Sequence, residues 1–512
     1  MQSLEDFKIA PRIGIQGSTK ISLKEVIERV LAGDPDLEIS RISLRQAAHS
    51  AKGAVGYFSP VLTLDTSKSR AVTPIASIIG GSSSGKLTST DFTITPTISG
   101  NSPWLGTSYS LKFSDSKQTN DSSFTTLNPQ YPSSLSLTFT QPLWRDLRID
   151  AGRRSLLVAR KNQSLSAERL RQKTIERVTQ AIQSYWELVF AWQNLEVQSQ
   201  AVGLATEQYN SNRRQAEQGI LAPIDVVAAQ TQVATYRQSL AAAQQTLTLA
   251  ENNLKQMMTS GSDNPLWSQA LIPETEVSLE FSAPSLEDAL KQAMNARPEL
   301  SESIISLDIN KIDARYYRDQ VRPQVDAFAT VTAAGLAGTQ QSAVPFGNFP
   351  IGKVPETLIG SNSQSLSNLW ARDFPTVKVG IQISLPLYNR TARENATISL
   401  LEGQRLQTAR KQMEMVVAAD VRNALEQLNS SRARYDAARM AARAAQEQYA
   451  SEQRQFKEGT STMFLVLQRQ TSMISARSGE VRARADLAEA IANVNRATTR
   501  TLEENQIKLD TQ

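Results

Sequence analysis

The sequence contains no cysteine among its 512 residues. Disulfide bonds, thiol catalysis, cysteine-zinc sites and a lipid-modified N-terminal cysteine are therefore not expected. Histidine is almost as scarce, because His49 is the only one, and it lies beside alanines on a predicted helix. The zinc-protease motif, the Walker A loop and the Rossmann glycine fingerprint are also missing. We therefore expect no active site, no cofactor and no metal site, and we do not expect an enzyme.

Neither sign of charge dominates the chain, which has 55 basic and 50 acidic residues and a net charge of +5 with no block of like charges. Nucleic acid is therefore not an expected partner. No apolar run reaches the roughly 18 residues of a transmembrane helix. Membrane β-strands escape such a scan, because their apolar residues alternate with polar ones. The first residues, MQSLEDFKIAPRIG, contain acids and no apolar segment, so they do not predict a signal peptide and taken alone favour the cytoplasm.

What the sequence does contain is a repeat of itself. Residues 207–219 match residues 447–459 at seven of thirteen positions, with Gly219 over Gly459. SLKEVIERVLAGDPDL (22–37) aligns with SLEDALKQAMNARPEL (285–300), and SLTFTQPLW (136–144) aligns with GIQISLPLY (380–388). All three pairs occur in the same chain order. The chain is therefore predicted to hold two copies of one unit, and the first copy carries extra residues, most of them between 60 and 136.

Each copy is predicted to contain a long helical hairpin. Residues 155–218 include no proline and one glycine, and apolar positions from Val178 to Val202 recur at alternating spacings of three and four. This spacing indicates a coiled-coil seam on a helix roughly 95 Å long. Gly219 suits the left-handed turn that ends a helix, and Pro223 suits the first turn of the next helix. Hairpin turns are therefore expected near 219 and 459.

Strands are indicated by alternation of apolar and small polar residues at 377–385, at 135–139 and, more weakly, at 325–331. The pattern suits strands between lipid and a wet lumen, although a half-buried strand of a soluble sheet looks the same. Segments 66–133 and 335–373, rich in Ser, Thr, Gly and Asn, are predicted to be long polar loops. Since membrane barrels need at least about eight strands and open edges cannot face lipid, about four strands per chain would require a barrel shared between chains.

Two aromatic residues, Trp144 and Tyr388, occupy the same repeat position just past the predicted strand ends. An aromatic belt at a membrane interface would fall there. The alternative is that both are ordinary core aromatics at a junction between strand and helix.

The doubled order of strands and hairpins resembles the TolC-like outer membrane efflux proteins of tripartite efflux and type I secretion systems. RPEL at 297–300, PLW and PLY at the strand ends, and the two glycine turns carry the resemblance, which covers residues 22–501. It implies a mainly α fold with a membrane β region. Two tandem structural repeats would supply long antiparallel coiled-coil hairpins forming an α-helical barrel. About four strands per chain would contribute to a shared trimeric β-barrel.

The function implied is that of a passive exit duct that carries small molecules or polypeptides to the exterior. The implied partners are two further copies of the chain, a periplasmic adaptor, an inner-membrane pump (RND, ABC or MFS type) and outer-membrane lipid, with the helical part in the periplasm of a Gram-negative-type cell. Such a protein must cross the inner membrane, so the true start would lie upstream or the chain would be processed. The alternative is a soluble coiled-coil scaffolding protein with a small β module.

The resemblance also assigns roles to residues at the hairpin tips. Adaptor docking falls to Gly219, Ile220, Leu221 and Ala222 in the first tip and to Gly459, Thr460, Ser461 and Thr462 in the second. Entrance or gate candidates are Asp225, Phe456, Leu465 and Gln468. The second repeat departs from the family at Leu465 and Gln468, because acidic residues are expected there.

Eight segments are predicted along the chain. They are an N-terminal segment with the first helix (1–55), a strand pair with a long polar loop (56–143), the first hairpin (144–258), a linker (259–284), the first helix of the second repeat (285–321), a second strand pair with a loop (322–387), the second hairpin (388–504) and a tail (505–512).

Overall fold

The structure is a computed structural model that describes residues 12–75, 85–275, 281–341 and 353–508. The chain divides into two compact units. We call residues 47–163 and 307–405 the sheet unit, and residues 1–46, 164–306 and 406–512 the helical unit. The long helices α2 (Pro35–Ala54), α3 (Ala151–Glu217) and α8 (Arg390–Lys457) contribute residues to both.

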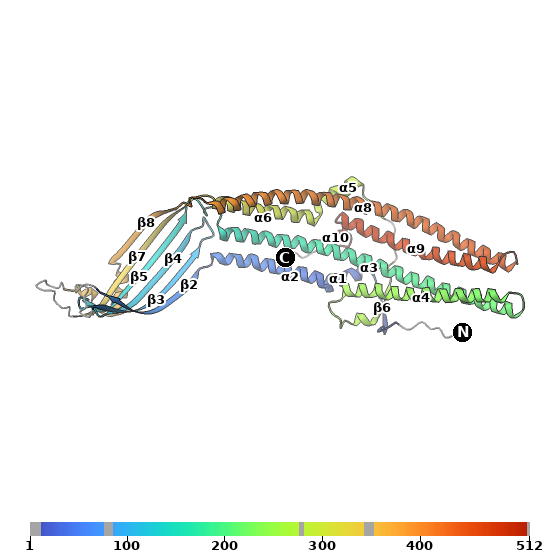
Figure 1. The fold of residues 1–512 in the computed structure, drawn as a ribbon, viewed down its shortest axis with the longest axis horizontal. Helices are drawn as coiled ribbons and strands as arrows, with labels where there is room; N and C mark the ends of the chain where they lie inside the picture. Colours follow the sequence, from blue (N-terminus) through green and yellow to red (C-terminus); the bar gives the residue numbers. More distant parts are fainter. Residues whose placement is uncertain (1–11, 76–84, 276–280, 342–352, 509–512) are drawn as a thin grey trace. The chain divides into compact units, whose positions relative to one another are not determined.

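The sheet unit is built on one antiparallel sheet in the order β2-β3-β4-β5-β7-β8, and Figure 1 shows these strands side by side. Their bounds are β2 Val61–Pro74, β3 Lys86–Asn101, β4 Ser108–Asn120, β5 Leu127–Pro142, β7 Gln324–Gln340 and β8 Phe374–Ser384. A 3-10 turn, Val55–Phe58, precedes β2.

The main sheet has six strands, whereas about four per chain were expected from the sequence. The predicted mainly α fold with a separate β region is confirmed, but segment 56–143 holds four strands and not a pair with a polar loop. The insertion forms the hairpin β3–β4. Its strands are built largely from Thr and Ser, and Thr fits a pleated strand well. Pro96 lies inside β3, and a proline in a strand pattern argues against a strand.

The second predicted loop, 335–373, also contains regular structure. β7 continues to Gln340, and α7 (Asn362–Ala371) follows a 3-10 turn at Glu356–Leu358. Gly335 lets α7 approach the sheet, because a Cβ built there would lie 2.2 Å from the Ser365 carbonyl oxygen. Ser133 and Ser365 join their hydroxyls at 2.8 Å across this contact. The Ser- and Asn-rich sequence of α7 predicts a loop, but in the fold this segment is a helix that packs against β5 and β7.

The helical unit contains two long antiparallel hairpins. In the first, α3 is followed by α4 (Pro223–Met258), and in the second α8 is followed by α9 (Met463–Ala497). Figure 1 shows that, within this unit, both hairpin turns lie at the same end. Buried residues from all four helices meet near these turns, including Ala205, Tyr236, Tyr449 and Met463. The hairpins are therefore packed together close to their tips.

Each repeat begins with two helices broken at a proline. α1 (Leu23–Gly33) precedes α2, and α5 (Leu286–Ala296) precedes α6 (Pro298–Gln320). Ser22 and Ser285 cap these pairs, since their hydroxyls accept from the amides of Glu25 and Asp288. A side-chain acceptor at this position satisfies an otherwise unpaired amide of the first turn. The two aligned serines therefore have the same structural role, which is to cap the first helix of each repeat.

Two further strands, β1 (Gly17–Ile21) and β6 (Gln269–Pro273), pair in parallel beside the first hairpin. A 3-10 turn at Pro265–Ser268 leads into β6, and α10 (Thr501–Glu504) closes the unit. Segments 1–55 and 259–284 were predicted without strands. The reason is distance, because the two five-residue strands lie about 250 positions apart in sequence and neither carries a strong pattern.

Candidate functional site

The sheet has one apolar face and one polar face. Side chains on successive residues of a strand point to opposite faces. The pairing register places apolar residues of neighbouring strands on one face and polar residues on the other. We call the face that carries Leu137, Phe139, Val331, Val379 and Ile381 the apolar face. All five side chains are exposed. A single chain therefore presents a broad apolar surface that it does not itself cover.

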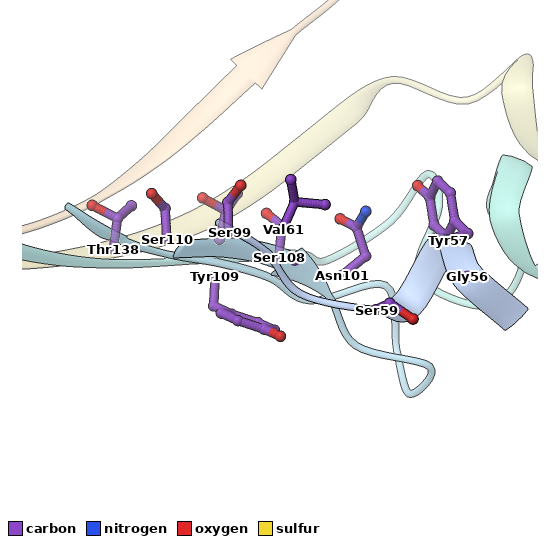
Figure 2. A pocket seen from close by; sticks show the side chains of 12 residues that line it. Gly56, Tyr57, Ser59, Val61, Ser99, Asn101, Ser108, Tyr109, Ser110 and Thr138 are labelled. Atoms are coloured by element: carbon purple, nitrogen blue, oxygen red, sulfur yellow. The ribbon is translucent and has the colours of Figure 1, made fainter. Parts of the chain in front are cut away.

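The polar face carries rows of hydroxyl groups. Ser136 and Thr332 are joined at 2.6 Å and Thr138 and Thr330 at 3.1 Å, each pair bridging β5 and β7. Near the start of β2 this face forms an open hollow of about 440 Å³. Figure 2 shows Ser99, Ser110 and Thr138 pointing into it from three strands, while Tyr109 points to the opposite face. This face is suited to contact water.

The two edges of the sheet, β2 and β8, have no strand partner on their outer sides among the described residues. Every residue of β2 is exposed, and so is every residue of β8 except Gly380. Leu62, Leu64 and Val377 lie on these edges with more than 60% of their surface exposed. Long, apolar, unpaired edges invite pairing with another chain.

Aromatic residues lie near both ends of the strands. Trp144 and Tyr388, the two predicted interface aromatics, are 49% and 77% exposed just past the ends of β5 and β8. Trp104, in the turn between β3 and β4, is 78% exposed and was not predicted. At the other end, Trp370 on α7 is 69% exposed. Exposure at the strand ends is what an interfacial belt requires.

At the hairpin tips, the two predicted turns share one backbone. Gly219 and Gly459 have φ of +77° and +79°, a region that favours glycine. The amides after them, of Ile220 and Thr460, donate back to the carbonyls of Gln215 and Gln455 at 2.9 Å each. The next helix starts at Pro223 in the first tip. In the second it starts after Thr462, whose hydroxyl accepts from the Leu465 amide.

The residues predicted for docking are mostly on the surface of the tips. Gly219, Ile220, Ala222, Gly459, Thr460 and Thr462 are exposed, whereas Leu221 and Ser461 are half-buried. The Ser461 hydroxyl donates to Glu452. Three further apolar side chains are exposed beside them and were not predicted, namely Ile224, Val227 and Phe464. Ile224 and Phe464 each directly follow the first residue of a helix, but that position alone does not show that they are exposed.

The four gate candidates do not share one environment. Gln468 is exposed, and Asp225 and Leu465 are half-buried. Phe456 is also half-buried and packs against the cluster that holds Tyr449, Met463 and Val466. Within the described residues Asp225 forms no ion pair, although its backbone carbonyl accepts from the Asn212 amide at 3.4 Å. The Asp225 carboxylate is therefore available to another chain.

Elsewhere in the helical unit, the Arg482 guanidinium lies close to three carboxylates. Arg482 contacts Glu187 at 2.5 Å and Asp486 at 2.7 Å, and it lies 3.8 Å from Glu489. Burial raises the pKa of Glu489 to about 7, Arg482 opposes this, and the neighbouring carboxylates Glu187 and Asp486 add to it. Glu489 is thus poorly compensated when it is charged.

A pH dependence of stability follows from Glu489. The pKa of Glu489 in the fold, about 7, exceeds the ordinary value of 4.5. Between pH 4.5 and pH 7 the folded state therefore binds a proton that the unfolded state has released. The free energy of unfolding consequently falls as pH rises through this window. Glu489→Gln should raise the free energy of unfolding at pH 8 by about 1–2 kcal/mol, given its partial exposure, and leave it unchanged at pH 4. The thermal unfolding midpoint at the two pH values measures this difference. Asp486→Asn, which removes a carboxylate bound to Arg482, should instead lower the midpoint at pH 8. A gain from Glu489→Gln of equal size at both pH values would contradict this account.

Among the residues that the structure describes, no helix is both long enough and apolar enough to cross a membrane. No group of three or more His, Cys, Asp or Glu side chains is placed to hold a metal ion in the described ranges.

Known proteins resemble the chain in family and in fold. The model of the family described as "Outer membrane efflux protein" matches residues 101–260 and 289–500. Among solved structures, the outer-membrane channel OprN superposes with a TM-score of 0.66 at 15% identity, covering 96% of each chain. The CmeC channel of Campylobacter jejuni gives 0.66 at 15% identity, covering 96% of this chain and 90% of its own. VceC of Vibrio cholerae gives 0.63 at 15%, covering 93% and 95%. No curated protein matches the chain in sequence.

Proposed function

The chain belongs to the outer membrane efflux protein family, and we propose that three copies of it form a passive exit duct driven by an inner-membrane pump. Channels of this family are not enzymes. The family match also argues against the alternative considered from the sequence, a soluble coiled-coil scaffolding protein. In the proposed assembly the strands of three chains close one barrel in the outer membrane, and the helices form a tunnel in the periplasm.

One observation carries the proposal: the sheet has an apolar face, a hydroxyl-lined face and two edges that no other strand of the described residues pairs with. Backbone groups left unpaired in lipid cost several kcal/mol each, so an open sheet cannot lie in a bilayer. Pairing β2 of one copy with β8 of the next satisfies both edges at once. The apolar face then contacts lipid and the polar face lines a wet lumen, which is the arrangement of an outer-membrane barrel.

The dimensions support a membrane role for the strands. β8 has eleven residues, so it extends roughly 34 Å, and at a tilt of about 40° it rises roughly 26 Å, close to the apolar band of such barrels. Trp104, Trp144 and Tyr388 at one end and Trp370 at the other lie near where the two interfaces would fall.

The proposed docking site for a periplasmic adaptor is the pair of hairpin tips. Both turns lie at one end of the helical unit (Figure 1) and expose Ile220, Ile224, Val227 and Phe464. Exposed apolar groups around a turn of fixed backbone suit recognition by another protein. The adaptor partner, the pump and the residues assigned to docking belong to this proposal.

The direct test is assembly and conductance. The purified chain should form trimers by native mass measurement, and the trimers should open ion-conducting channels in planar lipid bilayers. A monomer that binds no bilayer would overturn the proposal.

Asp225 is proposed to help hold the tunnel entrance closed. Its half-buried carboxylate has no ion pair in the described part of its own chain, so it can pair across to a neighbouring copy. Asp225→Ala should raise single-channel conductance, and the difference from the parent should shrink in high salt, which screens exposed charges. Glu217→Ala is the matched control, because Glu217 is an exposed carboxylate beside the same tip that pairs with Arg213 of its own chain. Equal effects of the two substitutions would remove Asp225 from the gate.

A further inference from the structure

We propose that the exit barrel has eighteen strands and admits bulky, hydrated cargo, because the hairpin β3–β4 is part of its wall. The inference rests on the proposed function, in which three copies close one barrel. Each copy contributes six strands in one continuous sheet, and three times six is eighteen. Four strands per chain, the number expected from the sequence, would have made twelve.

The pairing register carries the argument. One row of apolar residues crosses all six strands in unbroken partnership: Leu62, Ile98, Leu111, Leu137, Val331 and Val377. One residue along, Thr97 and Lys112 of the hairpin sit in a polar row with Ser136 and Thr332. A slip of one residue would turn every side chain to the wrong face. The hairpin therefore continues both faces of the sheet and does not form a loop above it.

Side-chain packing agrees with the register. Gly100 of β3 pairs with Tyr109 of β4 on the apolar face, and a Cβ built on Gly100 would lie 2.6 Å from the tyrosine oxygen. The ring thus covers the bare backbone at this position, a device that fixes strand pairing. Thr95 and Ser114 join hydroxyls at 3.4 Å on the polar face.

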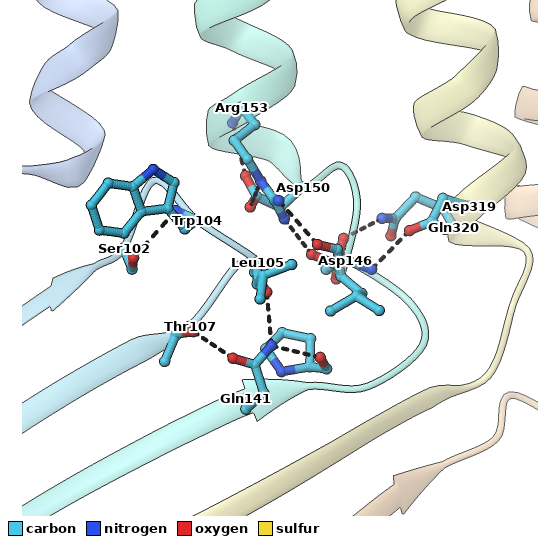
Figure 3. Close-up of polar contacts among 12 residues, drawn as sticks. Ser102, Trp104, Leu105, Thr107, Gln141, Asp146, Asp150, Arg153, Asp319 and Gln320 are labelled. Carbon is cyan, nitrogen blue, oxygen red and sulfur yellow. Dashed lines mark hydrogen bonds and ion pairs between the residues drawn. The ribbon is translucent and has the colours of Figure 1, made fainter.

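The turn between β3 and β4 is tied to the end of β5. Figure 3 shows Gln141 accepting from Thr107 and donating to the Leu105 carbonyl, the latter at 2.9 Å. Gly106, with φ of +69°, lies against the Asp146 carbonyl oxygen, which a Cβ would approach to 2.6 Å. Asp146 is itself held by Gln320 at 2.6 Å. These contacts join the hairpin turn to the end of β5 and to the segment that follows it.

The extra strands change the width of the exit. With strands about 4.8 Å apart and tilted by about 40°, eighteen strands enclose roughly 36 Å between opposite backbones, against roughly 24 Å for twelve. The hairpin adds mainly hydroxyl groups to the lumen, among them Thr95, Thr97, Ser99, Ser110 and Ser114. A wide, hydroxyl-lined passage suits a bulky hydrated solute and offers little to a small apolar one.

The absence of cysteine makes a labelling test direct. Ser110→Cys and Leu111→Cys lie on opposite faces of β4, and their register partners on β5, Thr138→Cys and Leu137→Cys, form the matched control pair. In outer membranes of intact cells, a membrane-impermeant maleimide should label Ser110→Cys and Thr138→Cys, and labelling should be lost at Leu111→Cys and Leu137→Cys, which face lipid.

The outcomes separate the two proposals. If the β5 pair differs and both β4 positions are labelled, the hairpin lies outside the wall and the eighteen-stranded barrel is wrong, while the duct stands. If the β5 pair also fails to differ, the sheet does not span a membrane and both proposals fall.

A deletion tests the width itself. Removing residues 86–124 leaves β2 antiparallel to β5 with Leu62 opposite Leu137, because the rows are continuous. Maleimides carried on polyethylene glycol of increasing mass should reach Thr138→Cys in the full chain at sizes that the deletion variant excludes. An identical size limit in the two proteins would overturn the proposal. If the deletion variant does not assemble, the labelling pattern on β4 still decides whether the β3–β4 hairpin is part of the barrel wall.

Discussion

Replacing Glu251 with leucine is expected to destabilise the helical unit by roughly 3–5 kcal/mol, the cost of leaving buried charge without its partner. Glu251 is fully buried on α4, and its carboxylate binds the Arg12 guanidinium through both oxygens. It also lies 3.7 Å from the ammonium of Lys255, whose side chain is likewise fully buried. Leucine would leave two cations in an apolar site, and the thermal unfolding midpoint should fall by several degrees.

The same variant should release the segment around Arg12. In the fold this arginine is held on α4, 239 positions away in sequence, so trypsin cleavage after Arg12 should be slow in the parent and rapid in Glu251→Leu. Burial lowers the pKa of Lys255, and a neutral amine tolerates an apolar site better than an ammonium. The loss of stability should therefore be smaller at pH 9 than at pH 6.

An exposed ion pair provides the control. Glu402 and Arg405 form a pair at 2.5 Å with both side chains open to solvent, and such pairs contribute little to stability because water and salt screen them. Glu402→Gln should therefore leave the midpoint nearly unchanged. If Glu251→Leu also leaves the midpoint unchanged and Arg12 stays protected from trypsin, the contacts among Arg12, Glu251 and Lys255 do not anchor the segment around Arg12.

Local rules were enough to predict the hairpin tips. A glycine followed four residues later by a proline indicates a helix end and a helix start, and Gly219 does adopt the expected positive φ. The coiled-coil seam was predicted less well. Val178, Ala181, Tyr185 and Leu188 are buried as expected, but the buried positions then move to Val197, Ala201 and Ala205. A straight helix drifts by about 20° per heptad, so a fixed spacing of 3.5 loses the buried side over two or three heptads.

Contacts between distant segments could not be read from the sequence. The pairing of β1 with β6 and the bond from Arg12 to Glu251 join residues about 240 to 250 positions apart, and no local pattern marks either. The β3–β4 hairpin was missed for another reason. Its apolar face is thin, with Pro96 opposite Leu64, and Asp115 and Lys117 lie on that same face further along. The alternation of apolar and polar residues in this hairpin becomes visible only when its residues are compared with their register partners on the neighbouring strands.

Assignments at the tips depended on the family resemblance and were limited by it. The docking residues expected around Gly219 and Gly459 ended at Ala222 and Thr462, whereas the exposed apolar surface continues to Ile224, Val227 and Phe464. Exposure depends on which helix face is covered by the neighbouring hairpin. The sequence of one helix does not contain that information.

On the sheet, Val379→Arg is expected to destabilise the barrel by about 2–4 kcal/mol, the cost of a cation at the middle of the lipid-facing surface. Val379 is the central residue of β8 and is 75% exposed on the apolar face. The cost should decrease toward the interface, so Ile383→Arg, four residues nearer the strand end, should be milder. Both can be measured from the urea concentration needed to unfold the protein reconstituted in lipid vesicles.

Gln382→Arg is the matched control, because it places the same side chain on the same strand but on the polar face. Its register partner is Asp326 of β7, so the new cation would lie in the wet lumen opposite a carboxylate, and little or no loss of stability is expected. Equal damage from Val379→Arg and Gln382→Arg would show that the two faces of β8 are not in different media. A large penalty at Val379 with none at Gln382 would place the apolar face against lipid. Because Val379 pairs in register with Ala329 on β7, Ala329→Arg should then show the same penalty one strand further into the sheet.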